Sequence, residues 1–164
     1  MTELPPIRDA EPADIPRLAA LLNEIIRQGG TTAMETELTD ADFAAQFLHN
    51  PGHLTCLTAV GPGDAPAGFQ ASARHPALPP GWADIATFAR RTDPVRGVGR
   101  ALFAATCDRL RGLGVTAVNA TIRADNALGL AYYARMGFEA YSVAHRVPLA
   151  DGTPVDRISK RFAL

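Results

Sequence analysis

The sequence predicts an α+β fold in which helices flank a mixed, mostly antiparallel sheet. Two observations predict it: three consecutive segments in the middle of the chain alternate or run apolar between turns, and the second half then follows a strand–helix–strand–helix order. That order implies at least one parallel pair of strands. The 164 residues, 47% hydrophobic and 20% charged, suit one domain with one core. We therefore expect a single domain over residues 1–164.

The N-terminal part of the chain predicts two helices. Apolar residues recur at helical spacing from Ile15 to Ile26, and Gly29-Gly30 ends that helix. Thr39-Asp-Ala-Asp42 resembles a capping box that opens a second helix. A loop over 28–38 joins the two.

The rest of the chain predicts six strands and two helices. The first three strands are most simply arranged as a meander, and a turn with Asp151-Gly152 joins the last two. In chain order we expect strands at 53–60, 67–75 and 83–90, a helix at 99–112, a strand at 115–122, a helix at 127–136, and strands near 139–147 and 155–162.

Composition excludes several classes of function. With Lys+Arg 16 against Asp+Glu 17 and no basic run, nucleic acid is not expected as a partner. Cys56 and Cys107 lack the nearby Cys or His of a metal or redox motif, so we expect two buried thiols and no metal site. No leader pattern and no run of 18 apolar residues occurs, so we expect a soluble cytoplasmic protein without a membrane partner.

The junction between the third middle strand and the next helix is suited to binding a phosphate group. Gly97 and Gly99 stand at the turn, where the free N–H groups and the dipole of a helix start favour an anion. Arg96 and Arg100 either add charge-assisted contacts or are simply solvated. Gly-x-Gly alone has little specificity. Leu102 replaces the third glycine of a dinucleotide fingerprint, and Arg100-Ala101 replace the Lys-Ser or Lys-Thr of a P-loop.

A second group of residues follows at 126–138. Gly137 is placed to end the helix in a left-handed conformation. Asn126 and Tyr133 are two helical turns apart, with Gly129 between them leaving room for a ligand. Taken singly, Asn126 is better explained as an N-cap and Tyr133 as a core aromatic.

Together these two motifs resemble the pattern of the GNAT acetyltransferases. The resemblance rests on Arg-Gly-Val-Gly-Arg-Ala-Leu at 96–102 followed by Asn-x-x-Gly-x-x-x-Tyr-x-x-x-Gly-Phe at 126–138. It extends over essentially the whole chain, from Ile7-Arg-Asp-Ala to the paired terminal strands. It implies the GNAT fold, with the order β-α-α-β-β-β-α-β-α-β-β, and acetyl-CoA as co-substrate.

The resemblance also implies where acetyl-CoA binds. The pantetheine arm would pair with the backbone of the fourth strand and bond Asn126, and the pyrophosphate would lie on the following loop. The implied binding residues are Thr87, Phe88, Ala89, Val95, Arg96, Gly97, Val98, Gly99, Arg100, Asn126 and Tyr133. One departure is Pro94, which replaces the usual Arg or Gln and donates no N–H, so that Arg96 and Arg100 carry more of the binding.

Two residues are candidates for catalysis. An amine must lose a proton before it attacks a thioester, and Asp84 matches an acidic position of the phosphinothricin acetyltransferase-like branch. A solvent-facing carboxylate at a strand start explains Asp84 equally well. Tyr133 resembles the family's acid: with a reference pKa of about 10, against about 8.5 for a thiol, it is protonated at neutral pH and able to protonate the departing thiolate.

The acceptor is less well defined. The loop Gly-Gly-Thr-Thr-Ala-Met-Glu at 29–35 resembles amino-acid acetyltransferases of that branch and favours a small amine or an amino acid. The loop before Trp82 and the terminal strands with His145 are further candidates for acceptor contacts. A peptide or protein N-terminus and a CoA-binding sensor without turnover, which Pro94 favours, are the alternatives. The resemblance is also compatible with a homodimer.

Overall fold

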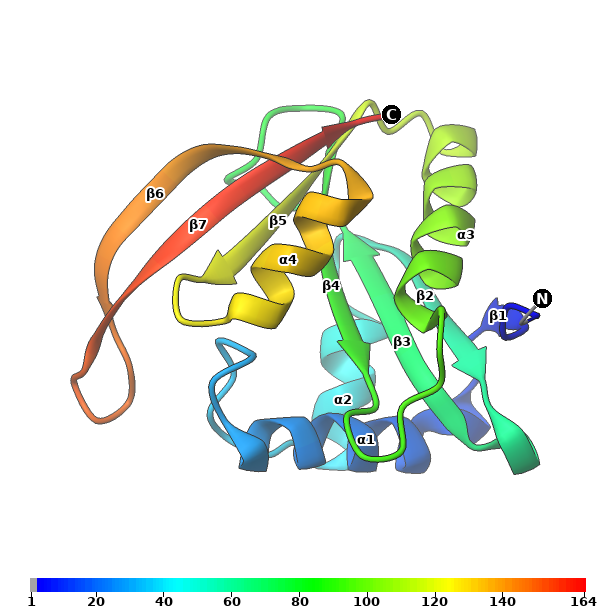
Figure 1. Ribbon diagram of the computed structural model, residues 1–164. Coiled ribbons are helices and arrows are strands. Elements are labelled where there is room, and N and C mark those ends of the chain that lie inside the picture. Colours follow the sequence, from blue (N-terminus) through cyan, green and yellow to red (C-terminus); the bar gives the residue numbers. More distant parts are fainter. Residues whose placement is uncertain (1–2) are drawn as a thin grey trace.

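The computed structural model describes residues 3–164 and contains one sheet of seven strands with four α-helices (Figure 1). Two short 3-10 turns, Pro12–Asp14 and Pro62–Asp64, complete the structure. In chain order the elements are β1 Ile7–Asp9, α1 Ile15–Gln28, α2 Asp40–Phe47, β2 His53–Val60, β3 Pro66–Ala73, β4 Trp82–Ala89, α3 Val98–Gly112, β5 Ala117–Arg123, α4 Ala127–Met136, β6 Glu139–Pro148 and β7 Pro154–Ala163.

The strand order in the sheet is β1-β2-β3-β4-β5-β7-β6. The first four strands form an antiparallel meander, β4 and β5 are parallel, and β6 and β7 form an antiparallel hairpin. The last strand of the chain, β7, is inserted between β5 and β6. The predicted α+β class, element order and parallel pair are therefore confirmed, and element ends shift by one or two residues.

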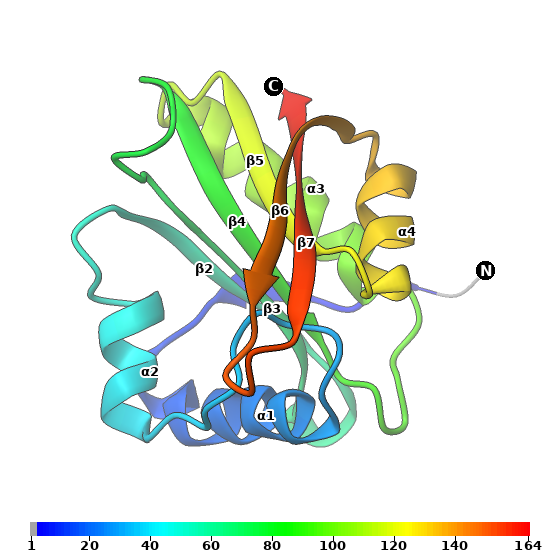
Figure 2. The same cartoon turned by 90° about the vertical axis from the view of Figure 1, so that its left-hand side faces the viewer.

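Helices cover both faces of the sheet (Figure 2). On one face, α1 and α2 bury an aromatic cluster that joins Phe43 and Phe47 to Phe69 and Phe88. On the other, α3 packs on β2 to β4 and α4 packs on β5, through residues such as Leu102, Leu110 and Tyr133. The α1–α2 layer lies over β2 to β4 and leaves β5 and β7 less covered on its side.

Local signals in the sequence account for the helix ends. Thr39 caps α2 by accepting a hydrogen bond from Asp42 N (3.1 Å), and the Asp42 carboxylate accepts one from Thr39 N, which confirms the capping box. Gly137 ends α4 at φ +100, a conformation that glycine adopts without strain. Cys56 and Cys107 are buried free thiols, as expected. No helix within residues 3–164 is both long and apolar enough to cross a membrane.

Candidate active site

A cavity of about 520 Å³ lies where β4 and β5 separate. The two strands pair only from Trp82 to Asp84, opposite Ala117 to Asn119, although β4 continues to Ala89. Beyond this short ladder, residues 85–89 and 121–123 form opposite walls of the cavity. The backbone edge of β4 that faces β5 therefore has no strand partner along the cavity. Because unpaired backbone groups away from water cost free energy, this edge is suited to pairing with an extended ligand.

The start of α3 adjoins the same cavity. Gly97 is the N-cap at φ +83, no side chain caps the helix, and the first intrahelical bond runs from Ala101 N to Gly97 O. The three N–H groups of residues 98–100 are thus without an intrahelical partner, which suits an anion. Arg96 and Arg100 are exposed and form no ion pair within the described part of the chain.

Residue 99 lines the cavity, and it is a glycine for a steric reason that the sequence did not reveal. A Cβ atom at this position would lie 2.6 Å from the ring of Tyr132. Tyr132 also donates a hydrogen bond to Gly99 O (2.8 Å). The missing side chain thus lets α4 pack closely against the first turn of α3.

Asn126 connects α4 to the loop between α1 and α2. Its Oδ1 accepts a hydrogen bond from Gly129 N (2.9 Å), as the N-cap of α4, and its Nδ2 donates to Thr31 O (2.9 Å). A Cβ on Gly129 would lie 2.3 Å from the Asn126 amide nitrogen. The room expected at Gly129 for a ligand is therefore filled by Asn126 itself.

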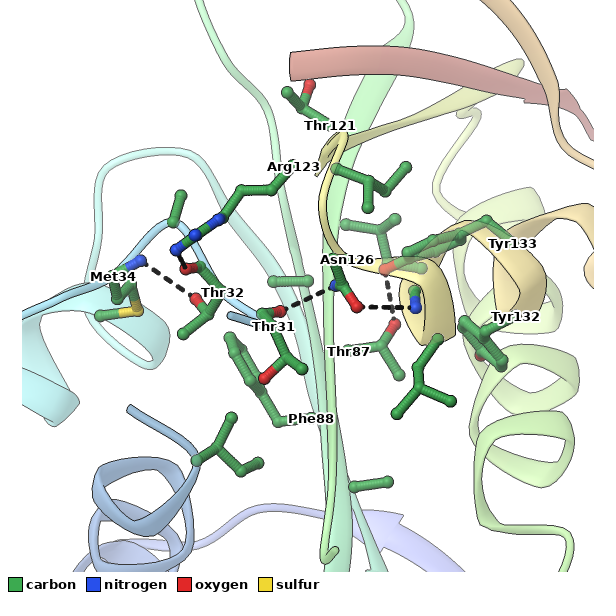
Figure 3. A pocket seen from close by; sticks show the side chains of 18 of the residues that line it. Thr31, Thr32, Met34, Thr87, Phe88, Thr121, Arg123, Asn126, Tyr132 and Tyr133 are labelled. Carbon is green, nitrogen blue, oxygen red and sulfur yellow. Dashed lines mark hydrogen bonds between the residues drawn. The ribbon is translucent and has the colours of Figure 1, made fainter. Parts of the chain in front are cut away.

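Arg123 holds the same loop from the end of β5 (Figure 3). Its side chain is 9% exposed and donates to Thr32 O (3.1 Å). Asp125 accepts two further hydrogen bonds from it, at 2.9 and 2.7 Å. Neighbouring carbonyls of the loop, on Thr31 and Thr32, are thus held by Asn126 and Arg123, and Figure 3 shows both hydrogen bonds.

A network of buried and half-buried hydroxyl and amide groups joins the wall of the cavity to Gln70 behind it. Gln70, fully buried, donates from Nε2 to Thr87 Oγ1 (2.9 Å) and to Tyr132 Oη (3.2 Å). Thr87 Oγ1 also shares a hydrogen bond of 2.9 Å with Tyr133 Oη. Tyr133 is 7% exposed, and burial raises its pKa well above the ordinary value; burial also raises the pKa of Tyr132, to about 12. Both tyrosines therefore hold their protons at neutral pH.

Asp84 lies at the opposite wall, where β4 last pairs with β5. Its Oδ1 accepts a hydrogen bond from Asn119 Nδ2 (2.8 Å), and Asn119 Oδ1 accepts one from Tyr141. Burial raises the pKa of Asp84, while the hydrogen bond from Asn119 and the charge of His75 partly offset the rise. Asp84 is thus a half-buried carboxylate in the cavity, held in place from the neighbouring strand.

Acid and base candidates approach the cavity from opposite faces of the sheet. Side chains alternate along a strand, and Ala83 and Ile85 belong to the α3–α4 cluster that contains Tyr133. Asp84, between them, therefore points toward the α1–α2 face. A group bound between β4 and β5 would have Tyr133 on one side and Asp84 on the other.

The family assignment rests on a sequence comparison. The model of the acetyltransferase (GNAT) family matches residues 18–138, which is more than half of the chain. This chain belongs to the GNAT family. The matched region contains Asp84, the α3 junction and α4, so it includes most of the residues that line the cavity.

Solved structures agree on the GNAT fold. A ribosomal-protein-alanine N-acetyltransferase from Brucella melitensis superposes with a TM-score of 0.85 at 23% identity, over 97% of this chain and 99% of that chain. A GNAT phosphinothricin acetyltransferase from Sinorhizobium meliloti, in complex with acetyl-CoA, gives 0.85 at 20% identity, over 99% and 89%. A GCN5-related N-acetyltransferase from Kribbella flavida gives 0.82 at 23%, over 97% of each. No curated protein sequence matches the chain. These superpositions show that the chains share a fold.

The structure brings together part of the residue set that the GNAT resemblance implied. Of these, Asp84, Thr87, Phe88, Ala89, Gly99, Asn126 and Tyr133 line the cavity. Val95 and Val98 pack into a core cluster, so only their backbone is free to contact a ligand, while Arg96, Gly97 and Arg100 lie outside the cavity wall. Their binding roles stay predictions.

Several cavity groups were not identified from the sequence. Arg123, Arg157 and Tyr132 line the cavity, and Gln70 lies beneath it. The double tyrosine at 132–133 was the only visible signal. His145, expected as a candidate on the terminal strands, is exposed, pairs with Asp156 (3.2 Å) and does not line the cavity.

We expect Gly99→Ala to destabilise the GNAT fold through Tyr132. Overpacking of this kind typically costs about 1–3 kcal/mol, although alanine by itself favours a helix. In a Tyr132→Ala background the ring is gone, and the same substitution should become neutral or stabilising. Urea unfolding of the four proteins in this double-mutant cycle measures the coupling. Strictly additive costs would show that the Tyr132 contact does not explain the glycine.

Proposed function

We propose that the chain is a single-domain N-acetyltransferase that moves an acetyl group from acetyl-CoA to the primary amine of a small molecule or an amino acid. One observation supports this most: the unpaired edge of β4 runs along a cavity that reaches the α3 junction at Gly99 and has Asp84 and Tyr133 on opposite walls. Such a cavity suits an extended thioester that meets an amine.

The residues present fit acetyl-CoA. The free N–H groups at the start of α3, with Arg96 and Arg100 exposed nearby, suit the pyrophosphate, and Pro94 leaves these backbone donors intact. The free edge of β4 at Thr87, Phe88 and Ala89 suits the amides of the pantetheine arm. Acetyl-CoA supplies the activated acetyl group as a thioester.

Asp84 is proposed to accept the proton that the amine must lose. Its raised pKa brings it closer to that of an amine, and Asn119 orients one carboxylate oxygen. The neutral amine then attacks the thioester carbonyl carbon, a C–N bond forms, and the C–S bond breaks with its electron pair leaving on sulfur. Asp84 returns its proton to solvent, and the nitrogen, once bonded to the acetyl carbon, loses a second proton to water, which balances the proton that the sulfur gains.

Tyr133 is proposed to donate a proton to that sulfur. The hydroxyl of Tyr132 is committed to Gly99 O, so it accepts from Gln70, and the second amide hydrogen of Gln70 goes to Thr87 Oγ1. Thr87 then donates its own hydroxyl hydrogen to Tyr133 Oη. In this arrangement the hydroxyl hydrogen of Tyr133 is free to point into the cavity.

Removal of the Tyr133 hydroxyl tests this assignment. We expect Tyr133→Phe to lower turnover about 10²- to 10⁴-fold, the usual value of general acid–base help, with little change in acetyl-CoA affinity. Thiol release from acetyl-CoA across a panel of amines, with calorimetry for binding, measures both. Tyr132→Phe, which loses a neighbouring hydroxyl, is the matched control and should lose less. Unchanged turnover in Tyr133→Phe would show that Tyr133 is a core residue without a catalytic role. A parent protein that releases no thiol with any amine would favour a CoA-binding sensor.

Asp84→Asn should separate catalysis from stability. The variant keeps the oxygen that Asn119 bonds but cannot take a proton, so turnover should fall most at the lower pH values, where the amine is mainly protonated.

For the stability of Asp84→Asn we expect the opposite of the effect on turnover, namely no loss at neutral pH. Because the folded pKa of Asp84 is raised, ionising this carboxyl costs stability as pH rises above its unfolded value of about 3.9, so the variant should be at least as stable as the parent at pH 7 and lose that advantage near pH 3. Kinetics from pH 6 to 10 and melting curves from pH 3 to 8 measure both effects, with the exposed Asp108→Asn as control. A less stable variant with an unchanged pH profile would make Asp84 structural.

A further inference from the structure

Two arginines face one another across β5 and β7 at the rim of the cavity. Arg123 and Arg157 are direct cross-strand partners, and both line the cavity. Side chains in this relation start about 5 Å apart on the same face of a sheet, and like charges placed so are destabilising. A carboxylate or a bound anion beside the second arginine would relieve this repulsion.

Local carboxylates neutralise only one of the two. Asp125 holds Arg123 through two hydrogen bonds, and Asp125 and, to a smaller extent, Glu35 raise the pKa of Arg123. Glu35 Oε2 also accepts a hydrogen bond from Ala150 N (2.8 Å). Arg157 is half-buried and makes no hydrogen bond or ion pair to any residue of 3–164.

The free guanidinium lies on the face from which an acceptor would reach Asp84. Asn119, Thr121 and Arg123 alternate along β5 on the face opposite the apolar Val118, Ala120 and Ile122. Asn119 bonds Asp84 at one end of this row, and Arg157 stands opposite its other end, about 13 Å away along the strand. Asp84 and Arg157 nevertheless line one and the same cavity.

The cavity is positively charged away from Asp84. Arg91, Arg123 and Arg157 line it, against Asp84 as the one carboxylate among the described lining residues. Arg91 follows β4 on the side of the α3 junction, so it belongs with the region proposed for acetyl-CoA. Arg157 is the cation left for the acceptor.

We propose that Arg157 binds a carboxylate of the acceptor, so that the substrate is a small amine that carries a free carboxylate, as an amino acid does. This deepens, and rests on, the acetyltransferase function proposed above. A planar guanidinium binds a carboxylate through two parallel hydrogen bonds, which fixes orientation as well as charge. The carboxylate at Arg157 then leaves the amine to extend along β5 toward Asp84.

The test compares free amino acids with their amides, which differ in the carboxylate. The parent should acetylate at least one acid with a kcat/KM well above that of its amide. Conversion to an amide lowers the pKa of the amine and makes it more available for attack, so this preference would not come from amine basicity. Arg157→Gln should reduce the acid-to-amide ratio about tenfold to a hundredfold, the usual loss for a charged hydrogen bond, and Arg157→Lys should keep part of it.

Arg161→Gln is the matched control, since Arg161 is four cross-strand pairs along the same strand and outside this cavity. It removes the same charge and should keep the ratio. Arg157→Gln should also melt no lower than the parent without ligand, because it relieves the facing charges. An Arg157→Gln variant that keeps the ratio, or a parent that prefers amides, overturns the carboxylate site while leaving the acetyltransferase function standing. Absence of thiol release with every amine overturns that function as well.

Discussion

The parting of β4 from β5 is the constraint on which the rest of the molecule depends. A central strand that pairs with β5 only as far as Asp84, and with β3 alone beyond it, leaves backbone groups that require a partner. The two helical layers support this arrangement, because α1 and α2 hold β4 to β3 on one face while α3 and α4 hold β5 on the other. The cavity is thus built by the parting of two strands in the sheet, with a helical layer packed on each face.

Polar groups around the gap have structural as well as chemical tasks. Asn126 caps α4 and holds the α1–α2 loop, and Arg123 holds the next carbonyl of the same loop. Because such residues serve both the fold and the cavity, each of them taken alone could be explained from the sequence as a structural residue. Asn126 is an N-cap and Tyr133 is a buried aromatic residue, as their structural explanations predicted, and both also line the cavity.

Most of the fold was predictable because its signals are local. Helical periodicity, the Thr39 capping box and the Gly97 junction each depend on a few neighbouring residues. The insertion of β7 between β5 and β6 depends on contacts between distant segments, and the sequence pattern does not encode it visibly. The same holds in the site: Gly99 was found as a turn glycine, but its contact with Tyr132 and the pairing of Arg157 with Arg123 arise only when the sheet assembles.

Amide hydrogen exchange with and without acetyl-CoA tests the central claim most directly. If the ligand completes the sheet, the amides of residues 85–89 that face β5 should gain protection on saturation, together with those of residues 98–100 at the start of α3. Amides of β4 that already pair with β3 should change little and are the internal control. Saturation with acetyl-CoA without any gain of protection along residues 85–89 would contradict the account, because the unpaired edge of β4 would then not be the binding surface.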